Sequence, residues 1–167
     1  MSRTIDRIDS AILRLFSTEP RIGVLEASRR LGVARGTVQA RLDRLGRDGV
    51  IAGWGPQLEL GSLGYPVMAL ATLEISQGAG HDSVAGHLDG IPEVLEAFTI
   101  TGAGDMWCRL VARSNPDLQR VIDKVVSFPG IQRTSTVIAL ATQVPYRVLP
   151  LLDETAGQSV ENASPGS

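Results

Sequence analysis

The sequence of 167 residues has little of what marks several specialised protein classes. Its single cysteine, Cys108, cannot form a disulfide within the chain, which excludes a disulfide-stapled secreted domain. No apolar run approaches the roughly 20 residues that span a bilayer, and charged residues near the start interrupt any signal-peptide core. We therefore expect a cytoplasmic protein with no membrane partner.

Residues that often carry catalytic chemistry are also scarce. The two histidines, His81 and His87, have no cysteine nearby, so they do not make a zinc-binding pattern. The sequence contains neither a phosphate-binding P-loop nor a Gly-x-Ser-x-Gly nucleophile motif. Two Trp, two Tyr and three Phe offer little surface for stacking on single-stranded nucleic acid. We expect no catalytic site, no metal and no cofactor.

Charge is distributed unevenly along the chain, although the formal net charge is only -2. Residues 1–53 contain ten arginines and six acids, a balance of +4, whereas residues 54–167 contain six basic and twelve acidic side chains, a balance of -6. Parts of opposite sign indicate two domains with different partners. The basic part is the candidate for binding a polyanion.

Helical periodicity predicts three helices in the basic part. The first begins after Asp6, which can cap it together with Asp9 three residues on, and the second spans 24–31. Gly32 fits a sharp reversal, because glycine adopts positive φ without a steric penalty. The third helix spans 34–47. Two helices joined by about four residues that include glycine form a helix-turn-helix arrangement.

The third predicted helix has an apolar stripe of Val38, Leu42 and Leu45 and a polar opposite face. Small residues on that face allow the backbone to approach a groove floor, while hydroxyl and amide groups reach base edges and arginines reach phosphates. An ordinary solvated helix face is the alternative. The candidate DNA-binding residues are Arg35, Gly36, Thr37, Gln39, Ala40, Arg41, Arg44 and Arg47.

After this helix, Asp48-Gly49 leads into an alternating apolar stretch, which predicts a short strand over 50–54 and a winged helix-turn-helix.

A set of short motifs runs through the N-terminal part: Ile5-Asp6-Arg7-Ile8-Asp9, Ile12-Leu13, Pro20-Arg21, Leu31-Gly32-Val33, Val38-Gln39-Ala40-Arg41-Leu42-Asp43-Arg44-Leu45, Asp48-Gly49-Val50-Ile51 and Leu63-Gly64. In these motifs the chain resembles the Lrp/AsnC (leucine-responsive, feast/famine) transcriptional regulators over about sixty residues without gaps. Two departures from the family pattern are Ala34, where the family usually has serine, and Ala27-Ser28, where it favours Leu-Ala.

The acidic part predicts a second domain with a β-α-β-β-α-β order, the ferredoxin-like split unit, so the fold class is α+β. We expect a winged helix-turn-helix domain over 1–53, a linker with a short strand at 57–60 over 54–65, an effector-binding and oligomerisation domain over 66–149, and a largely disordered tail over 150–167. The expected strands are 67–75, 94–101, 106–112 and 131–141, and the expected helices are 83–88 and one that begins near Asn115.

A sheet with both helices on one side leaves its other face bare. Alternate strand positions Leu70, Leu73, Val111 and Ile138 include some that need cover, and pairing of two sheets into a homodimer would provide it. Two helix-turn-helix units about one helical repeat apart would then read a roughly palindromic site in double-stranded DNA. The resemblance, which extends over about residues 5–150, implies assembly of dimers into higher oligomers, such as an octamer.

The resemblance also implies a small effector, typically an amino acid. The family's Gly-x-x-Asp effector loop has its counterpart in Gly102-Ala103-Gly104-Asp105, where backbone N–H groups could hold a carboxylate and Asp105 an ammonium. A plain hairpin turn is the alternative. The candidate effector-binding residues are Thr101, Gly102, Ala103, Gly104, Asp105, Thr134 and Thr136.

Two other functions remain open from the sequence. An architectural, nucleoid-type protein would bind DNA broadly without responding to a metabolite. A haem enzyme similar to sirohaem decarboxylases shares both domain types and uses histidine and arginine, but His81 and His87 lie outside the effector loop. We therefore predict a transcriptional regulator that binds specific DNA and is not an enzyme.

Overall fold

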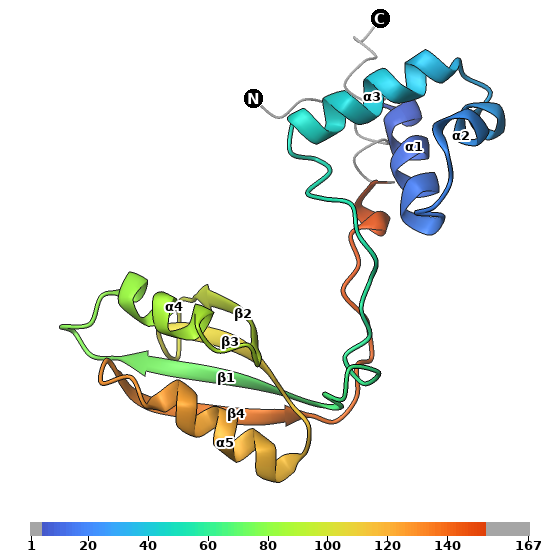
Figure 1. Ribbon diagram of the computed structural model, residues 1–167. Helices are drawn as coiled ribbons and strands as arrows, with labels where there is room; N and C mark the ends of the chain where they lie inside the picture. The colour runs from blue at the N-terminus through green and yellow to red at the C-terminus, as the bar shows by residue number, and fades with distance from the viewer. Residues whose placement is uncertain (1–4, 153–167) are drawn as a thin grey trace, which may run out of the picture. The chain divides into compact units, whose positions relative to one another are not determined.

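The computed structural model describes residues 5–152, which form two compact units (Figure 1). One unit contains the residues up to Gln57 together with the segment that begins at Pro145, and we call it the helical unit. The other, Leu58–Val144, is the sheet unit. The boundary between Gln57 and Leu58 falls inside the predicted linker, whereas the boundary between Val144 and Pro145 falls inside the domain predicted over 66–149. None of the described helices is both long and apolar enough to span a membrane.

The tail predicted over 150–167 lies mostly outside the described residues. Its described part belongs to a helical turn over 149–152, which is assigned to the helical unit. The side chain of Leu152 is only 9% exposed. The predicted disorder of 153–167 stays a prediction, because those residues are not described.

Helix α1 (Arg7–Thr18) begins with the predicted cap. The carboxylate of Asp6 accepts a hydrogen bond from the Asp9 N–H at 2.8 Å, and the carboxylate of Asp9 accepts one from the Asp6 N–H at 3.1 Å. This reciprocal capping box satisfies two backbone donors that would otherwise lack a partner at the helix start. It also fixes both carboxylates at the N-terminal end of α1.

Helices α2 (Val24–Leu31) and α3 (Arg35–Arg47) confirm the helix-turn-helix. Gly32 ends α2 in the left-handed conformation with φ 65°, the geometry that glycine adopts most readily. Ala34 caps α3 without a side-chain hydrogen bond. The departure from serine at this position therefore leaves the start of α3 without the hydroxyl that usually stabilises such a cap.

The three helices enclose one small hydrophobic core in the helical unit. Ile12 and Val38 are completely buried, and burial of such a side chain stabilises a fold by about 1.5–3 kcal/mol. The buried members of this core are Ile12, Phe16, Ala27, Val38 and Leu42.

Two of the predicted short strands were wrong. Neither 50–54 nor 57–60 forms a strand in the described structure. The N–H groups of Val50 and Ile51 both donate to the Leu45 carbonyl, at 2.9 and 3.1 Å, and so cap the C-terminal end of α3. A strand needs a partner to bond with, and an alternating pattern does not supply one.

The sheet unit confirms the β-α-β-β-α-β order in an antiparallel sheet arranged β2-β3-β1-β4 (Figure 1). Its hydrophobic core lies between the sheet and both helices, and it includes Leu73, Leu110 and Val121, each with no exposed surface. The elements are β1 (Val67–Ile75), α4 (His81–Asp89), β2 (Val94–Thr99), β3 (Met106–Ala112), α5 (Asn115–Val126) and β4 (Ile131–Ala139).

The opposite side of the sheet, which we call the open sheet face, carries Met68, Leu70, Phe98, Trp107 and Val137. Phe98 is 51% and Val137 59% exposed in the single chain. The rings of Phe98 and Trp107 lie 5.8 Å apart. An apolar surface of this kind is typical of a protein interface.

Two of the four residues expected on the bare face lie on the helix side of the sheet. Leu70 does lie on the open sheet face, where it is half-buried. Val111 pairs with Met68 and so also lies on that face, although it is only 3% exposed, whereas Leu73 belongs to the core under the helices. Ile138 pairs with the core residue Ala69 and so lies on the helix side of the sheet, although it is 46% exposed at the edge strand.

Candidate functional site

The outer face of α3 is accessible in the helical unit. Val38, Leu42 and Leu45 point into the core with 0, 9 and 2% exposure, so the opposite side of the helix meets solvent. The exposed candidate residues on α3 are Arg35, Gly36, Thr37, Gln39, Ala40 and Arg47. We call this group the outer face of α3.

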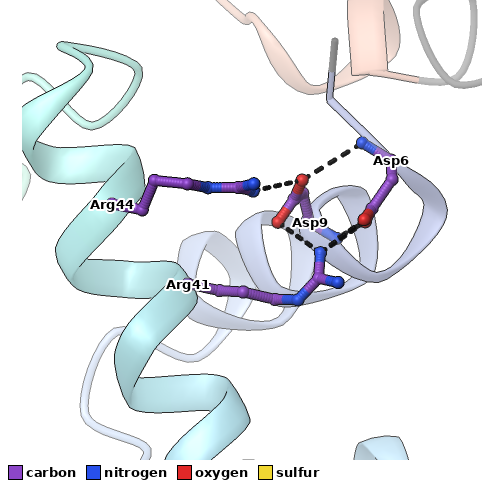
Figure 2. A network of polar contacts seen from close by, with 4 residues as sticks. All are labelled: Asp6, Asp9, Arg41 and Arg44. Carbon is purple, nitrogen blue, oxygen red and sulfur yellow. Dashed lines mark hydrogen bonds and ion pairs between the residues drawn. The ribbon is translucent and has the colours of Figure 1, made fainter. Parts of the chain in front are cut away.

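Arg41 and Arg44, also predicted to contact DNA, are bonded inside the protein (Figure 2). The Nη1 of Arg41 lies 2.6 Å from Asp6 Oδ2 and 2.8 Å from Asp9 Oδ1. The Nη2 of Arg44 lies 2.5 Å from Asp9 Oδ2. This acid–arginine network joins α1 to α3, and its carboxylate Asp9 is completely buried.

Hydrogen bonds within the network favour the charged forms of Asp6 and Arg41. Partial burial opposes ionisation of Asp6, but hydrogen bonds from Arg41 and the Asp9 backbone outweigh it and hold the pKa of Asp6 below its usual value of 3.8. The hydrogen bonds to Asp6 and Asp9 raise the pKa of Arg41. Arg41 and Arg44 therefore hold α1 against α3 in the described structure, and their predicted contact with DNA phosphates stays a prediction.

Two polar residues of the outer face also bond within α3. Gln39 Nε2 donates to Asp43 Oδ1 at 2.8 Å, which orients the amide along the helix surface. Arg47 Nε donates to the Asp43 carbonyl at 3.3 Å. Both side chains remain exposed, so these bonds orient them without removing them from solvent.

Gly36 has no steric reason to be glycine in this fold. A Cβ at Gly36 would meet nothing within 4 Å, and the residue is exposed. Glycine inside a helix costs about 1 kcal/mol relative to alanine. A close approach of another molecule to this part of α3 would explain the glycine.

Sequence reasoning did not identify Asp9 as the partner of the arginines. The signal was present, because Asp9 stands three residues before Ile12 and seven before Phe16, on the same buried stripe of α1. A carboxylate on a buried stripe requires cationic or hydrogen-bond partners. Arg41 and Arg44 supply them.

In the sheet unit, the loop between β2 and β3 is held tightly to the end of β1. The Asp105 N–H donates to the Leu73 carbonyl at 2.8 Å, and Asp105 Oδ2 accepts from the Ile75 N–H at 2.7 Å. Gly104 has φ 102°, and a Cβ there would lie 2.4 Å from Thr72 Cγ2. Gly104 and Asp105 therefore have structural roles in this loop.

Beside this loop lies an open hollow of about 680 Å³. Of the predicted effector residues it brings together Gly102, Gly104 and Asp105. Thr101 and Ala103 are exposed elsewhere on the loop. The hollow is lined by Glu74, Ile75, Gln77, Gly102, Gly104, Asp105 and Gln132.

Thr134 and Thr136 lie on the helix side of the sheet, and neither lines this hollow. Their Cα partners on β1 are Leu73 and Ala71, both core residues on the helix side. Their hydroxyls lie 3.5 Å from each other. The polar residues that sequence reasoning missed are Glu74, Gln77 and Gln132, and only their position near strand ends could have indicated them.

His87, one of the two histidines considered for an enzyme, has a structural environment. Its Nε2 lies 2.9 Å from the Lys124 carbonyl and 3.1 Å from the Val125 carbonyl, near the end of α5. Its ring stacks on Phe128 with 5.2 Å between centroids. These contacts join α4 to α5.

Two domain families match this chain by sequence profile. The AsnC-type helix-turn-helix domain matches residues 5–46, and the Lrp/AsnC ligand binding domain matches residues 67–149. The first range covers α1, α2 and nearly all of α3, and the second covers all four strands of the sheet.

Similar proteins match most of the chain. An uncharacterized HTH-type transcriptional regulator of Pyrococcus abyssi is 34% identical over 135 residues, which are 80% of this chain and 85% of that protein. Regulatory protein AsnC of Escherichia coli is 28% identical over 147 residues, which are 87% of this chain and 97% of AsnC.

Solved structures share the architecture. The structure of E. coli AsnC has a TM-score of 0.82 at 27% identity and covers 89% of this chain and 100% of that chain. A transcriptional regulator of Neisseria meningitidis, solved as a complex with L-Met, has a TM-score of 0.77 at 23% identity and covers 86% of this chain and 94% of that chain. The second likeness is one of fold.

Proposed function

This chain belongs to the Lrp/AsnC family of transcriptional regulators, and we propose that it binds specific sites in double-stranded DNA under the control of a small effector, an amino acid. The observation that carries the proposal is the exposed outer face of α3, the second helix of the helix-turn-helix. In such motifs the second helix enters the major groove.

The outer face of α3 assigns separate tasks to its residues. Thr37 and Gln39 are the groups for base edges, because a hydroxyl or amide can pair with them. Gly36 and Ala40 allow close approach of the backbone. Arg35 and Arg47 are the proposed phosphate ligands; each lies at one end of α3 and is exposed.

We also propose a homodimer that buries the open sheet face, with dimers assembling further, up to an octamer. The exposed side chains of Phe98 and Val137 support it, because they would otherwise remain in water. A two-fold dimer carries two helix-turn-helix motifs and matches a roughly palindromic site. Binding to chromosomal DNA requires a cytoplasmic location.

The proposed effector site is the hollow beside the β2–β3 loop. Gly102 can present backbone N–H groups to a carboxylate, and the Asp105 carboxylate, although bonded to the Ile75 N–H, can also accept from an ammonium group. This arrangement is complementary to a free amino acid. The L-Met complex of the N. meningitidis regulator supports that class of effector.

A binding experiment tests whether the protein recognises specific DNA sites. Duplexes of roughly 30 bp, long enough for two half-sites one helical turn apart, are selected from a random library with the wild-type protein. We expect the selected duplex to bind at least 10³-fold more tightly than a shuffled duplex of equal composition, measured by fluorescence anisotropy. Equal affinity for both duplexes would contradict specific binding and favour an architectural protein.

The effector is tested with the same assay and a panel of the twenty amino acids. An effector shifts the affinity for the selected duplex about 5- to 150-fold, and the duplex shifts the effector affinity by the same factor. We expect Asp105→Asn to lose this response and to retain the basal DNA affinity. An unchanged response in this variant would place the effector elsewhere.

A further inference from the structure

Two acidic residues at the start of α1 bond two of the four arginines of α3. Asp6 contacts Arg41, and the buried Asp9 contacts both Arg41 and Arg44 (Figure 2). We propose that Asp6 and Asp9 are positioning residues for DNA recognition: they fix the rotation of α3 about its axis and keep Arg41 and Arg44 away from DNA phosphates. This inference rests on the proposed DNA binding by the outer face of α3.

The contacts lie where they can control rotation of the helix. At about 100° per residue, Arg41 lies on the flank of α3 next to the buried stripe, and Arg44 lies about 60° further round the helix, beside Thr37. The ion pairs of Asp9 with Arg41 and Arg44, three residues apart on α3, restrain the helix in addition to the core packing of Val38 and Leu42. Without these ion pairs, α3 can rotate about its axis while it remains packed on the core.

The network also determines which arginines are available to DNA. Arg41 is only 22% exposed and Arg44 35%. A move of both side chains to phosphates would leave Asp9, which has no exposed surface, as an unpaired buried charge. Such a charge is strongly unfavourable, so both arginines stay with the acids.

This arrangement makes the number of phosphate contacts depend on α1. Each phosphate neutralised by a cation adds about 0.9 to the slope of log affinity against log salt concentration. Neutralising Asp9 takes away the acid partner of Arg44 and frees this cation for phosphates on any sequence, whereas neutralising Asp6 leaves Arg41 paired with Asp9. Binding to non-specific DNA then strengthens, while discrimination between sequences falls because α3 is less firmly oriented.

The test uses asparagine variants that retain the helix cap. Asparagine caps a helix about as well as aspartate, so Asp6→Asn removes the charge and keeps the capping hydrogen bond. Asp9→Asn is the test variant, and Arg41→Ala carries the test if Asp9→Asn does not fold. Asp82→Asn, on α4 of the sheet unit, is the control for net charge.

Affinities for the selected and shuffled duplexes are measured by anisotropy over a series of KCl concentrations. For Asp9→Asn we expect a slope steeper by about 1 on the shuffled duplex and a specificity ratio lower by about tenfold. Asp6→Asn keeps the wild-type slope, because Arg41 stays paired with Asp9, and Asp82→Asn keeps the wild-type slope and ratio. Adding Arg44→Gln to Asp9→Asn returns the slope to wild type, a rescue that mere loss of stability would not produce.

Arginine variants separate this inference from the proposed function. We expect Arg47→Ala to reduce the slope by about 0.9 and Arg41→Ala to leave it unchanged. A lower slope in Arg41→Ala, with no change in Asp9→Asn, would refute the positioning role alone. No effect of Arg47→Ala and Thr37→Ala on either duplex would refute the DNA-binding face of α3 and this inference with it.

Discussion

The helical unit and the sheet unit each contain a buried carboxylate that binds two cations of one neighbouring helix. In the helical unit, Asp9 binds Arg41 and Arg44 of α3. In the sheet unit, Glu93 is 6% exposed and binds two cations of α5, Arg120 at 2.7 Å and Lys124 at 3.6 Å. The hydrogen bond from Arg120 holds the pKa of Glu93 below its usual value despite the burial.

The two carboxylates differ in how completely they are bonded. Both oxygens of Asp9 accept short hydrogen bonds or ion pairs, and one also accepts the Asp6 N–H. Among the described residues, Glu93 Oε2 has no hydrogen-bond partner and only the longer ion pair to Lys124. The ten arginines of the first 53 residues therefore overstate the cations that a polyanion can reach, because Arg41 and Arg44 are paired with Asp6 and Asp9 inside the fold. The +4 balance is not affected by this pairing, since it already counts both acids.

The largest effect is expected from removing Asp9. Asp9→Ala leaves Arg44 without its acid partner and Arg41 with Asp6 alone, and we expect the helical unit to lose about 3–5 kcal/mol of stability. Urea unfolding in a Trp107→Phe background follows this unit through Trp54, whose ring packs edge-on against Phe16. A loss below 1 kcal/mol would show that the network contributes little.

Glycine substitutions compare the exposed helix surfaces of the two units. Gly36 of α3 and Gly86 of α4 are both exposed, and a Cβ at either would meet nothing within 4 Å. We expect Gly36→Ala and Gly86→Ala each to stabilise its own unit by about 1 kcal/mol in urea unfolding.

Only Gly36→Ala is expected to weaken binding to the selected duplex, by about tenfold, because its methyl group meets the groove. Gly86→Ala serves as the matched control. Equal DNA affinity in both variants would argue against close approach of α3 to DNA.

Removal of Glu93 is expected to have a smaller effect than removal of Asp9. The side chains of Arg120 and Lys124 are 41% and 47% exposed and can be solvated once Glu93 is gone. We expect Glu93→Ala to destabilise the sheet unit by about 1 kcal/mol, followed through Trp107 in a Trp54→Phe background. A loss equal to that of Asp9→Ala would remove the difference between the two sites.

The smallest expected effect is on acid stability. The folded pKa values of Asp6 and Glu93 lie below their unfolded values of 3.8 and 4.5. Their contributions are therefore fully present above those values and are lost as pH falls through the folded pKa values. Urea midpoints should be flat between about pH 6 and 8 and fall below about pH 4 in both units. Asp6→Asn should flatten only the helical unit's response.

Local signals in the sequence predicted much of the fold. The cap at Asp6, the reversal at Gly32 and the apolar stripe on α3 each depend on residues close together in the chain, and the structure contains all three. The strand expected over 50–54 required a distant partner, and none is present in the described chain. Its alternation alone could not decide the outcome.

The candidate sites were predictable only in part for the same reason. Periodicity identified the exposed side of α3, but it could not indicate that Arg41 faces α1, since that depends on how two helices pack. Alternation placed Thr134 and Thr136 on one face of β4 without telling which face covers the core. Register with β1 decides this, and register is set between strands.

The helical unit contains residues from both ends of the described chain, up to Gln57 and from Pro145 onward, with the whole sheet unit between them. During synthesis the residues up to Gln57 are made before the sheet unit, and the segment from Pro145 is made after it. The side chain of Leu152 can therefore reach its buried place only after the whole sheet unit has been synthesised. A chain truncated after Val144 would contain the whole sheet unit but would lack the last described segment of the helical unit.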